Sequence, residues 1–310
     1  MPLETVTAAI LAQMAQSGAP ELHQMTAVES RAMYRDLKPD IPLVDVYRVE
    51  DSSVPGPAGE IPVRIYWPTA APAAIHVHFH GGGWVIGDLE THDADCREIC
   101  RGAACIVVAV DYRLAPEHIF PAALEDCYAV TCWASENSAE LGALSSPVSV
   151  GGDSAGGNLA ASVCLLARDR AGPNIAMQLL IYPVTDATME SASYRDNADG
   201  YLLSRKMMAW FWDHYCPDPA QRSDQLASPI RAADLSGLPP ALVMTAEFDP
   251  LRDEGEAYAE RLKAAGVAVQ VRRFDGLIHG FFSQAGMIEA AREGVDLAVK
   301  ALREAHKISG

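Results

Sequence analysis

The sequence predicts an α/β protein built around a mostly parallel β-sheet with helices on both faces. Short apolar runs typical of strands alternate along the chain with segments of helical periodicity, and this alternation is typical of a parallel sheet. The chain has 310 residues, 49% apolar and 21% charged, which suits one large globular domain or two small ones. A glycine-flanked serine, Ser154, lies where a predicted strand meets a predicted helix.

The predicted strands follow a helical N-terminal region. Residues 44–49 and 61–67 alternate or are rich in β-formers, and the turn-rich stretch 51–59 separates them. Several later apolar runs have the length of buried strands, and a last segment alternates again. In order, the predicted strands are 44–49, 61–67, 75–79, 106–110, 148–151, 179–182, 241–245 and 269–274.

Helical segments separate most of the later strands. Two further regions, residues 1–43 and 184–228, fall outside the alternation, and the second is longer than one crossover helix needs. It contains the apolar cluster Trp210, Phe211 and Trp212, which indicates either a lid over the sheet or an ordinary buried helix pair. The other predicted helices are 93–101, 121–136, 158–170, 254–265 and 289–305.

Composition excludes several classes of function. The net charge is −17 and no basic cluster is present, which argues against nucleic-acid binding. The first residues lack the pattern of a signal peptide, and no run of about 18 uncharged apolar residues predicts a membrane span. The seven cysteines are odd in number and form no C-x-x-C pair, so reduced thiols and a cytoplasmic location are expected. A catalytic cysteine has no local support.

The stretch Gly152-Asp153-Ser154-Ala155-Gly156 matches the G-x-S-x-G pattern of a nucleophile elbow. In such an elbow the serine occupies a strained strand-to-helix turn, and the two glycines avoid crowding it. The following helix would present unpaired N–H groups, including that of Ala155, to an anion formed beside the serine. Because the pattern is short, its interpretation depends on the rest of the chain.

A serine nucleophile needs a base, and the base needs an orienting carboxylate. In elbow proteins these follow the serine in the order acid, then histidine. Asp249 comes directly after the predicted strand 241–245, at the sheet edge where catalytic groups gather. Glu247 and Asp253 are the competing carboxylates. His279 follows the last predicted strand after a short loop, so we predict the triad Ser154, Asp249 and His279.

An oxyanion site is predicted in the glycine-rich stretch after strand 75–79. Preorganised N–H donors there would stabilise the negative charge that acyl transfer places on a carbonyl oxygen. The expected donors are Gly81, Gly82 and Ala155, with Gly83 as a further candidate. A phosphate cradle is the alternative for a glycine-rich loop, but neither the P-loop pattern nor the dinucleotide pattern is present.

Together these segments resemble the hormone-sensitive-lipase-like family of α/β-hydrolases, the bacterial family IV carboxylesterases with a His-Gly-Gly-Gly motif. The resemblance runs from about residue 60 to the C-terminus and keeps the order of the motifs. The matching segments are His80 to Trp84 with Gly87-Asp88, Asp111 to Glu117 with Phe120 to Ala123, Gly152 to Gly157, Tyr182-Pro183, Asp249 to Asp253 and His279 to Phe281.

The resemblance implies an eight-stranded sheet, with a helical cap formed by residues 1–43 and 184–228 over a catalytic domain formed by 44–183 and 229–310. It also implies hydrolysis of short- to medium-chain acyl esters without a metal or organic cofactor, and a homodimer is a weaker expectation. In this family the histidine at the position of His80 shapes the glycine loop and is not a base.

Other candidate residues carry open alternatives. His76, His78 and His80 share one strand face and could in principle bind zinc, but partners in the surrounding core are the expected reason for the first two. Four aromatic residues could line the substrate pocket or simply pack in the core. They are Trp84, Tyr182, Phe211 and Trp212.

The same triad would also serve an amidase or an arylacetamide deacetylase, because an amide differs mainly in needing better protonation of its leaving group. A non-catalytic small-molecule receptor on the same fold is the remaining alternative. In the plant gibberellin receptors the triad histidine is replaced, so the presence of His279 favours an enzyme.

Overall fold

The computed structural model describes residues 2–37, 42–72, 74–143 and 147–308, and within them an eight-stranded sheet forms in the order β1-β2-β4-β3-β5-β6-β7-β8. The pairs β1–β2 and β2–β4 are antiparallel, and the other neighbouring pairs are parallel. The predicted eight-stranded, mostly parallel sheet is confirmed. The strands are β1 (Arg48–Gly56), β2 (Gly59–Trp67), β3 (Ile75–Phe79), β4 (Ile106–Val110), β5 (Val148–Asp153), β6 (Ile175–Ile181), β7 (Ala241–Phe248) and β8 (Val269–Ile278).

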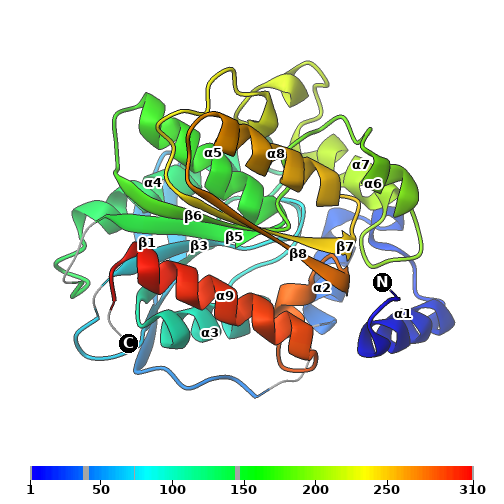
Figure 1. The fold of residues 1–310 in the computed structure, drawn as a ribbon, viewed down its shortest axis with the longest axis horizontal. Coiled ribbons are helices and arrows are strands. Elements are labelled where there is room, and N and C mark those ends of the chain that lie inside the picture. Colours follow the sequence, from blue (N-terminus) through cyan, green and yellow to red (C-terminus); the bar gives the residue numbers. More distant parts are fainter. Residues whose placement is uncertain (1, 38–41, 73, 144–146, 309–310) are drawn as a thin grey trace.

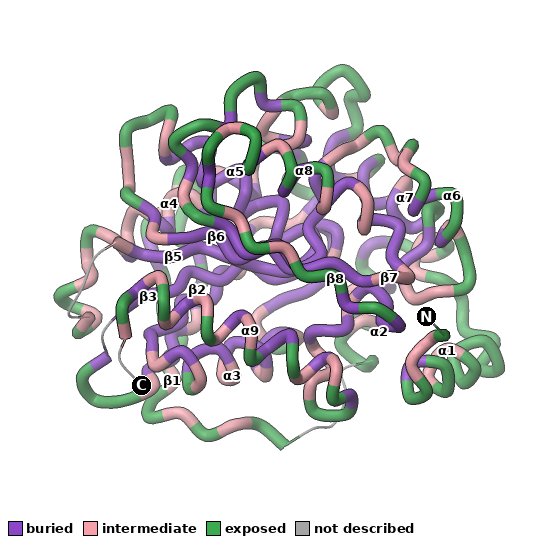
Figure 2. The backbone as a smooth tube through the Cα atoms, in the orientation of Figure 1, coloured by how far each residue is buried: buried purple, intermediate pink, exposed green. Residues whose placement is uncertain are grey.

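Helices cover both faces of the sheet, as the alternation predicts (Figure 1). The helices α3 (Asp93–Ala103) and α9 (Glu289–Ala305) pack together on one face. On the other face lie α4 (Ala122–Glu136), α5 (Ala155–Asp169) and α8 (Arg252–Ala264). The sheet is therefore the middle of three layers, and its central strands are buried (Figure 2).

The burial of β4 shows why the central strands are continuous apolar runs. All five of its residues are buried. Alternate side chains point to opposite faces: Ile106, Val108 and Val110 join one apolar cluster, while Val107 and Ala109 join the other. A strand covered on both sides needs apolar residues at every position, so the pattern of period two disappears.

The edge hairpin β1–β2 differs from the prediction. Its first strand is Arg48–Gly56, so the predicted strand 44–49 begins and ends too early, and the turn within the predicted turn region 51–59 is confined to residues 57–58. Only Val54 of β1 is buried, and polar pairs across the hairpin stabilise it. Asp51 lies opposite Arg64 and accepts hydrogen bonds from its guanidinium, at 2.6 Å for the shorter one. Ladder hydrogen bonds on an exposed edge do not require the apolar residues by which strands are recognised.

The last strand also differs from the prediction. β8 continues from Val269 to Ile278, whereas the predicted strand ended at residue 274. A register irregularity between β7 and β8, next to Gly276 with a φ of 79°, lets the strand continue past its predicted end. His279 therefore follows the strand directly, without the short loop expected between them.

The helices outside the layers gather at the end of the sheet where β7 ends (Figure 1). In this region α7 contacts the short helix η1 (Leu22–Gln24). The larger helices of the group are α1 (Thr5–Ser17), α2 (Ala27–Asp36), α6 (Ala192–Asp196) and α7 (Arg205–Tyr215). Three further short turns are η2 (Gln221–Ser223), η3 (Pro229–Arg231) and η4 (Phe281–Gln284). The part of residues 1–43 at 38–41 lies outside the described residues.

Candidate active site

Ser154 stands between β5 and α5 in the backbone conformation that its motif predicts. Its φ is 54° and its ψ is −116°, a backbone conformation that residues other than glycine rarely adopt. The Ser154 N–H donates to the carbonyl of Ile181 at 2.8 Å, which ties the turn to β6. Gly156 cannot carry a side chain, because a Cβ there would collide with the Phe79 carbonyl oxygen. The elbow is thus fixed by its neighbours on both sides.

The structure brings Ser154, His279 and Asp249 into one hydrogen-bonded line. The Ser154 Oγ lies 2.9 Å from Nε2 of His279, and Nδ1 of His279 lies 2.8 Å from Oδ2 of Asp249. With the proton on Nδ1, the imidazole donates to the carboxylate, and Nε2 is left to accept the serine proton. Asp249 is fully buried, and its other oxygen accepts the Leu251 N–H at 2.9 Å.

The competing carboxylates point elsewhere. Glu247 accepts the Gly276 N–H at 2.7 Å, and Asp253 accepts the Ser193 N–H at 2.7 Å. The carboxylate that contacts the His279 ring is that of Asp249, so the geometry favours Asp249 as its partner.

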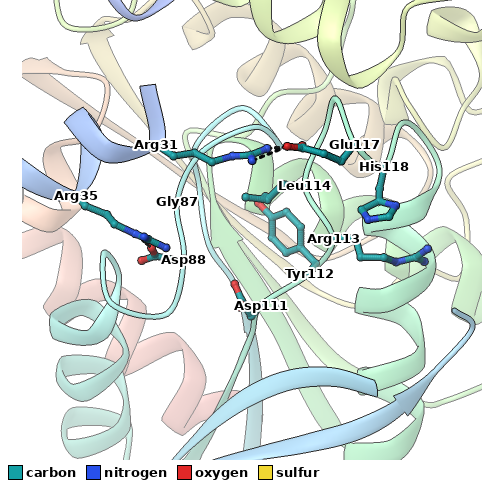
Figure 3. A pocket seen from close by; sticks show the side chains of 10 residues that line it. All are labelled: Arg31, Arg35, Gly87, Asp88, Asp111, Tyr112, Arg113, Leu114, Glu117 and His118. Carbon is teal, nitrogen blue, oxygen red and sulfur yellow. Dashed lines mark hydrogen bonds and ion pairs between the residues drawn. The ribbon is translucent and has the colours of Figure 1, made fainter. Parts of the chain in front are cut away.

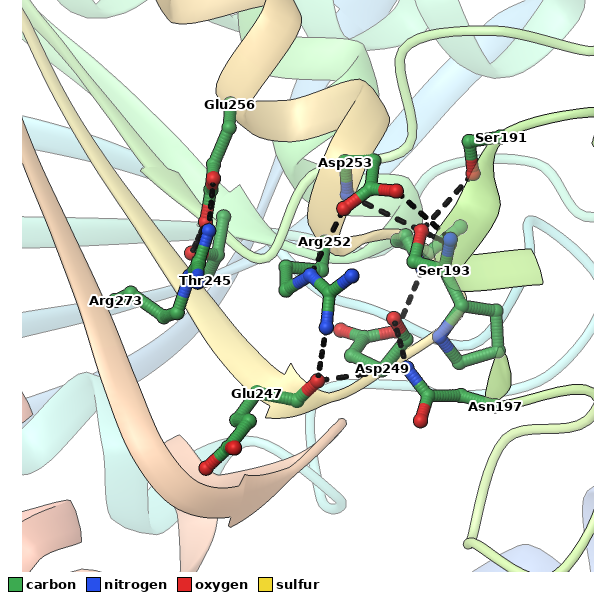
Figure 4. A network of polar contacts seen from close by, with 12 residues as sticks. Ser191, Ser193, Asn197, Thr245, Glu247, Asp249, Arg252, Asp253, Glu256 and Arg273 are labelled. Carbon is green, nitrogen blue, oxygen red and sulfur yellow. Dashed lines mark hydrogen bonds and ion pairs between the residues drawn. The ribbon is translucent and has the colours of Figure 1, made fainter. Parts of the chain in front are cut away.

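Helix α6 holds the loop that carries Asp249 (Figure 4). The Asn197 side-chain amide donates to the Asp249 carbonyl at 3.2 Å, and the Ser193 hydroxyl donates to the Pro250 carbonyl at 2.6 Å. The Asp253 N–H donates back to the Ser193 hydroxyl at 3.2 Å. A segment of the 184–228 region thereby fixes the backbone at Asp249, the predicted acid of the triad. No short sequence motif predicts this role for the segment.

The glycine-rich loop differs from the prediction at Gly81. Its N–H donates to Oδ1 of Asp153 at 2.8 Å, so it is already engaged and does not point to a vacant anion site. A Cβ at Gly81 would collide with the same carboxylate, which explains the glycine without an oxyanion role. The prediction of Gly81 as a donor is therefore corrected. Among the described residues, none accepts the N–H of Gly82, Gly83 or Ala155.

His80 binds the carbonyl group of the same residue, Gly81. Its Nδ1 donates to the Gly81 carbonyl at 2.7 Å, and its ring stacks on Tyr112 with the centroids 4.2 Å apart. Burial and the nearby His92 lower the pKa of His80 to about 3, so the ring is neutral and a poor base at neutral pH. These contacts support the expected role of His80 in shaping the loop.

The four aromatic candidates for the substrate pocket have different surroundings. Trp84 and Trp212 are fully buried, and Trp84 stacks on Tyr215 with centroids 4.1 Å apart, which is core packing. Tyr182 lies 4.5 Å from the His279 ring between centroids. The Phe211 ring packs directly against Gly83, where a Cβ would collide with it. Phe211 and Tyr182 are thus the two candidates that contact site residues.

Of the two buried histidines of β3, His76 has a hydrogen-bond partner at Nδ1, whereas neither ring nitrogen of His78 has one among the described residues, so the expectation of partners is wrong for His78. His76 Nδ1 lies 3.0 Å from the Ser149 hydroxyl, which also lies 2.9 Å from Nε2 of His306. Burial lowers the pKa of His78 to about 4 and keeps it neutral. Within residues 2–37, 42–72, 74–143 and 147–308, no group of three or more His, Cys, Asp or Glu side chains is arranged to hold a metal ion.

A separate surface pocket of about 410 Å³ lies beside α2 (Figure 3). Arg31 crosses it to bind Glu117 through two hydrogen bonds of 2.8 and 2.6 Å, and Arg35 pairs with Asp88. The Arg31 guanidinium also donates to the Ala115 carbonyl at 2.8 Å. None of the triad residues lines this pocket, and its contacts fasten α2 to the sheet domain.

Comparison with known proteins gives the family. Residues 76–283 match the model of a family described as having the alpha/beta hydrolase fold, so the chain belongs to that family. The carboxylic ester hydrolase LipN of Mycobacterium tuberculosis is 48% identical over 284 residues, which are 89% of this chain and 76% of LipN. The ethyl acetate hydrolase of Pseudomonas putida is 40% identical, covering 79% of this chain and 78% of that enzyme.

Solved structures agree with these relatives. A thermostable esterase from Pseudomonas putida has a TM-score of 0.95 and 38% identity, and the match covers 99% of both chains. A hyperthermophilic esterase from Pyrobaculum calidifontis has a TM-score of 0.92 and 40% identity, covering 98% of this chain and 99% of that one. No helix in the described ranges is long and apolar enough to cross a membrane.

Proposed function

We propose that this protein is a serine carboxylesterase in which Ser154 is the nucleophile, His279 the general base and Asp249 the orienting acid. The class of reaction, carboxylic ester hydrolysis, rests on the named relatives. The assignment of roles rests on one observation above all. The Ser154 hydroxyl lies 2.9 Å from Nε2 of the His279 imidazole, and Nδ1 of the same imidazole lies 2.8 Å from the Asp249 carboxylate.

In the first half-reaction, Nε2 of His279 takes the Ser154 proton as Oγ attacks the ester carbonyl. Asp249 keeps Nδ1 protonated and stabilises the imidazolium that forms. His279 then gives its proton to the leaving alkoxide, and the alcohol departs. The acyl group remains on Ser154 as an ester.

In the second half-reaction, water replaces the alcohol. His279 takes a proton from the water, which attacks the acyl carbonyl, and the carboxylic acid leaves as Ser154 recovers its proton. In both tetrahedral intermediates the oxyanion accepts hydrogen bonds from the N–H groups of Gly82, Gly83 and Ala155. This assignment is supported because none of these three N–H groups donates a hydrogen bond to another described residue.

The substrates we propose are esters with short- to medium-chain acyl groups. The name of the ethyl acetate hydrolase relative supports this range. Phe211 against Gly83 and Tyr182 against His279 would bound the acyl or alcohol side of the site. We also propose that residues 1–43 and 184–228 form a cap over a catalytic domain of residues 44–183 and 229–310.

Three finer proposals concern the setting of the enzyme. A cytoplasmic location is supported by the seven cysteines, which are free thiols. The net charge of −17 supports the absence of nucleic-acid binding. A homodimer is carried over from the family resemblance, and light scattering would measure it.

Replacing Ser154 tests the function directly. Ser154→Ala should lower kcat for p-nitrophenyl butyrate by about a thousandfold or more, because the acyl acceptor is lost. Ser162→Ala is the matched control, since Ser162 lies on α5 and donates only to the Leu226 carbonyl. The control should keep kcat within about twofold. A loss of less than about tenfold in Ser154→Ala would rule out this nucleophile.

An organophosphonate probe and a matched substrate pair separate the alternatives. The wild-type enzyme should gain the mass of one phosphonyl group and the Ser154→Ala variant should not. A protein that hydrolyses no ester and forms no adduct would instead be a receptor. Comparing an aryl acetate with the corresponding aryl acetamide distinguishes an esterase from an amidase, and we expect the ester to react faster by at least about a hundredfold.

A further inference from the structure

A buried carboxylate precedes the proposed nucleophile by one residue. Asp153 is 8% exposed, and its Oδ1 accepts the Gly81 N–H at 2.8 Å. Nε2 of His92, which is 3% exposed, lies 3.3 Å from the same oxygen. One carboxylate therefore joins three segments: the elbow, the glycine loop and the residue just before α3. The triad mechanism uses neither Asp153 nor His92.

Each ring nitrogen of His92 lies beside an oxygen that can accept a proton from it. The Thr91 hydroxyl has one proton, which it donates to the Asp88 carbonyl at 2.9 Å, and it accepts the Asp88 N–H at 2.9 Å. Its remaining lone pair faces His92 Nδ1 at 2.9 Å, so Nδ1 must donate. Nε2 lies 3.3 Å from Oδ1 of Asp153 and 3.2 Å from the Gly81 nitrogen, so it can either carry a proton toward the carboxylate or accept the Gly81 N–H. An imidazolium satisfies both Thr91 and Asp153, and the Gly81 N–H then donates to Asp153 alone.

Charge explains why the pair matters for the reaction proposed above. A bare carboxylate beside Ser154 would repel the negative charge that develops on the substrate oxygen, and burial would weaken the screening of that repulsion. We propose that protonated His92 is a positioning residue: it neutralises Asp153, so that this carboxylate can anchor the glycine loop through Gly81 without opposing the oxyanion. This inference rests on the proposed esterase function.

The surroundings of His92 favour its charged form. Burial alone lowers the pKa of His92, but Asp153, Asp95 and Asp88 raise it, and the result is a raised pKa. Burial raises the pKa of Asp153, yet His92 and two further histidines outweigh this and lower it to about 2. The groups facing His92 are Asp153 of β5, Asp95 of α3, Asp88 of the preceding loop, and the neutral imidazoles of His78 and His80.

The test compares His92→Asn, Asp153→Asn and the double variant with the wild type, using kcat and KM for p-nitrophenyl acetate from pH 6 to about 10. In His92→Asn the carboxylate is uncompensated, so kcat should fall at least about tenfold while KM stays within about threefold. The double variant should recover at least about threefold over His92→Asn, because the repelling charge is removed. Purely structural damage would instead accumulate in the double variant.

The pH profile gives a second measurement. Wild-type kcat should decline at alkaline pH as His92 loses its proton, and this alkaline limb should be absent from the double variant. Thr91→Val leaves both charged residues in place but removes the acceptor of Nδ1–H. It should therefore move the midpoint of the alkaline limb to lower pH by about half a unit or more. This variant keeps the test valid if His92→Asn does not fold.

Three results would overturn the inference. They are an unchanged kcat in His92→Asn, a double variant no better than His92→Asn, and a Thr91→Val profile identical to that of the wild type. Each can occur while the wild-type enzyme hydrolyses the ester and Ser154→Ala does not, in which case the proposed esterase function stands. Loss of the Ser154 requirement would overturn the function instead.

Discussion

At the scale of single residues, the triad depends on how tightly its acid is held. Asp249 is fully buried, and its two oxygens are occupied by the His279 ring and the Leu251 N–H. An ionised carboxylate in this position fixes both the tautomer and the orientation of the imidazole. The hydroxyl of Ser154 then faces an unprotonated nitrogen before any substrate arrives.

Asp249→Asn tests this arrangement. The amide can keep the contact with His279 but favours the wrong tautomer, so kcat should fall by about a thousandfold or more with little change in KM. Steady-state kinetics on a p-nitrophenyl ester measures the effect. Asp253→Asn is the matched control, because Asp253 lies in the first turn of α8 and accepts the Ser193 N–H of α6 instead of contacting the His279 ring. If both variants lost activity equally, Asp249 would have no special role.

At the scale of secondary-structure elements, the short helix α6 acts as a support for the β7–α8 loop. Ser193 of α6 and Asn197, which directly follows the helix, bind the backbone carbonyls of Pro250 and Asp249 (Figure 4). These bonds cross from the 184–228 region to the sheet domain. The position of the triad acid therefore depends on a segment far from it in sequence.

Asn197→Ala should loosen this support. Without the amide, the Asp249 carbonyl loses a hydrogen-bond partner, so kcat should fall about three- to thirtyfold. The loss of this buried hydrogen bond should also lower the free energy of unfolding by about 1–2 kcal/mol. Kinetics at 25 °C and urea unfolding separate the two effects. Thr188→Ala removes a hydroxyl bonded only to Asp186 in the same region, and it should change neither quantity appreciably. Equal effects of the two substitutions would contradict the role given to Asn197.

The elements best predicted from sequence are those whose environment is uniform. The strands 75–79 and 106–110 and the helix 289–305 have the predicted bounds, because both strands are buried throughout and the helix has a clear apolar face. The edge strand β1 could not be predicted well, since its polar residues are exposed and its pairing with β2 decides its extent.

The site shows the same division. Ser154, Asp249 and His279 were predicted because each follows a strand at one sheet edge and the chemistry fixes their order. The engagement of Gly81 with Asp153 could not be predicted, because it depends on the register of β3 against β5, in which Phe79 lies opposite Gly152. Nothing in the local sequence around His92 announces its contact with Asp153.

At the scale of the whole molecule, buried neutral histidines couple folding to pH. Burial lowers the pKa of His306 to about 4, below its ordinary value of 6.5. Between these two values the unfolded chain binds a proton that the folded protein does not, so this residue makes stability fall as pH drops from 6.5 to about 4. Burial has the same effect on His78, whereas Asp95, with its pKa raised to about 6, acts in the opposite direction.

His306→Asn isolates one contribution. It should flatten the dependence of unfolding free energy on pH between 4 and 6.5 by up to about 1.4 kcal/mol per pH unit relative to the wild type. Urea unfolding at several pH values measures this slope. His118→Asn, at an exposed position, should leave the slope unchanged. If His306→Asn were equally sensitive to acid, its burial would not be a source of pH dependence.

The contact between His306 and Ser149 also fixes the direction in which α9 ends. Ser149 is near the beginning of β5, whereas Ser154 follows its end, so the last turn of α9 lies toward the opposite rim of the sheet. A linker fused after α9 would therefore lead away from the catalytic groups. Attaching the enzyme to a solid support through such a linker should leave the reaction side open to dissolved esters.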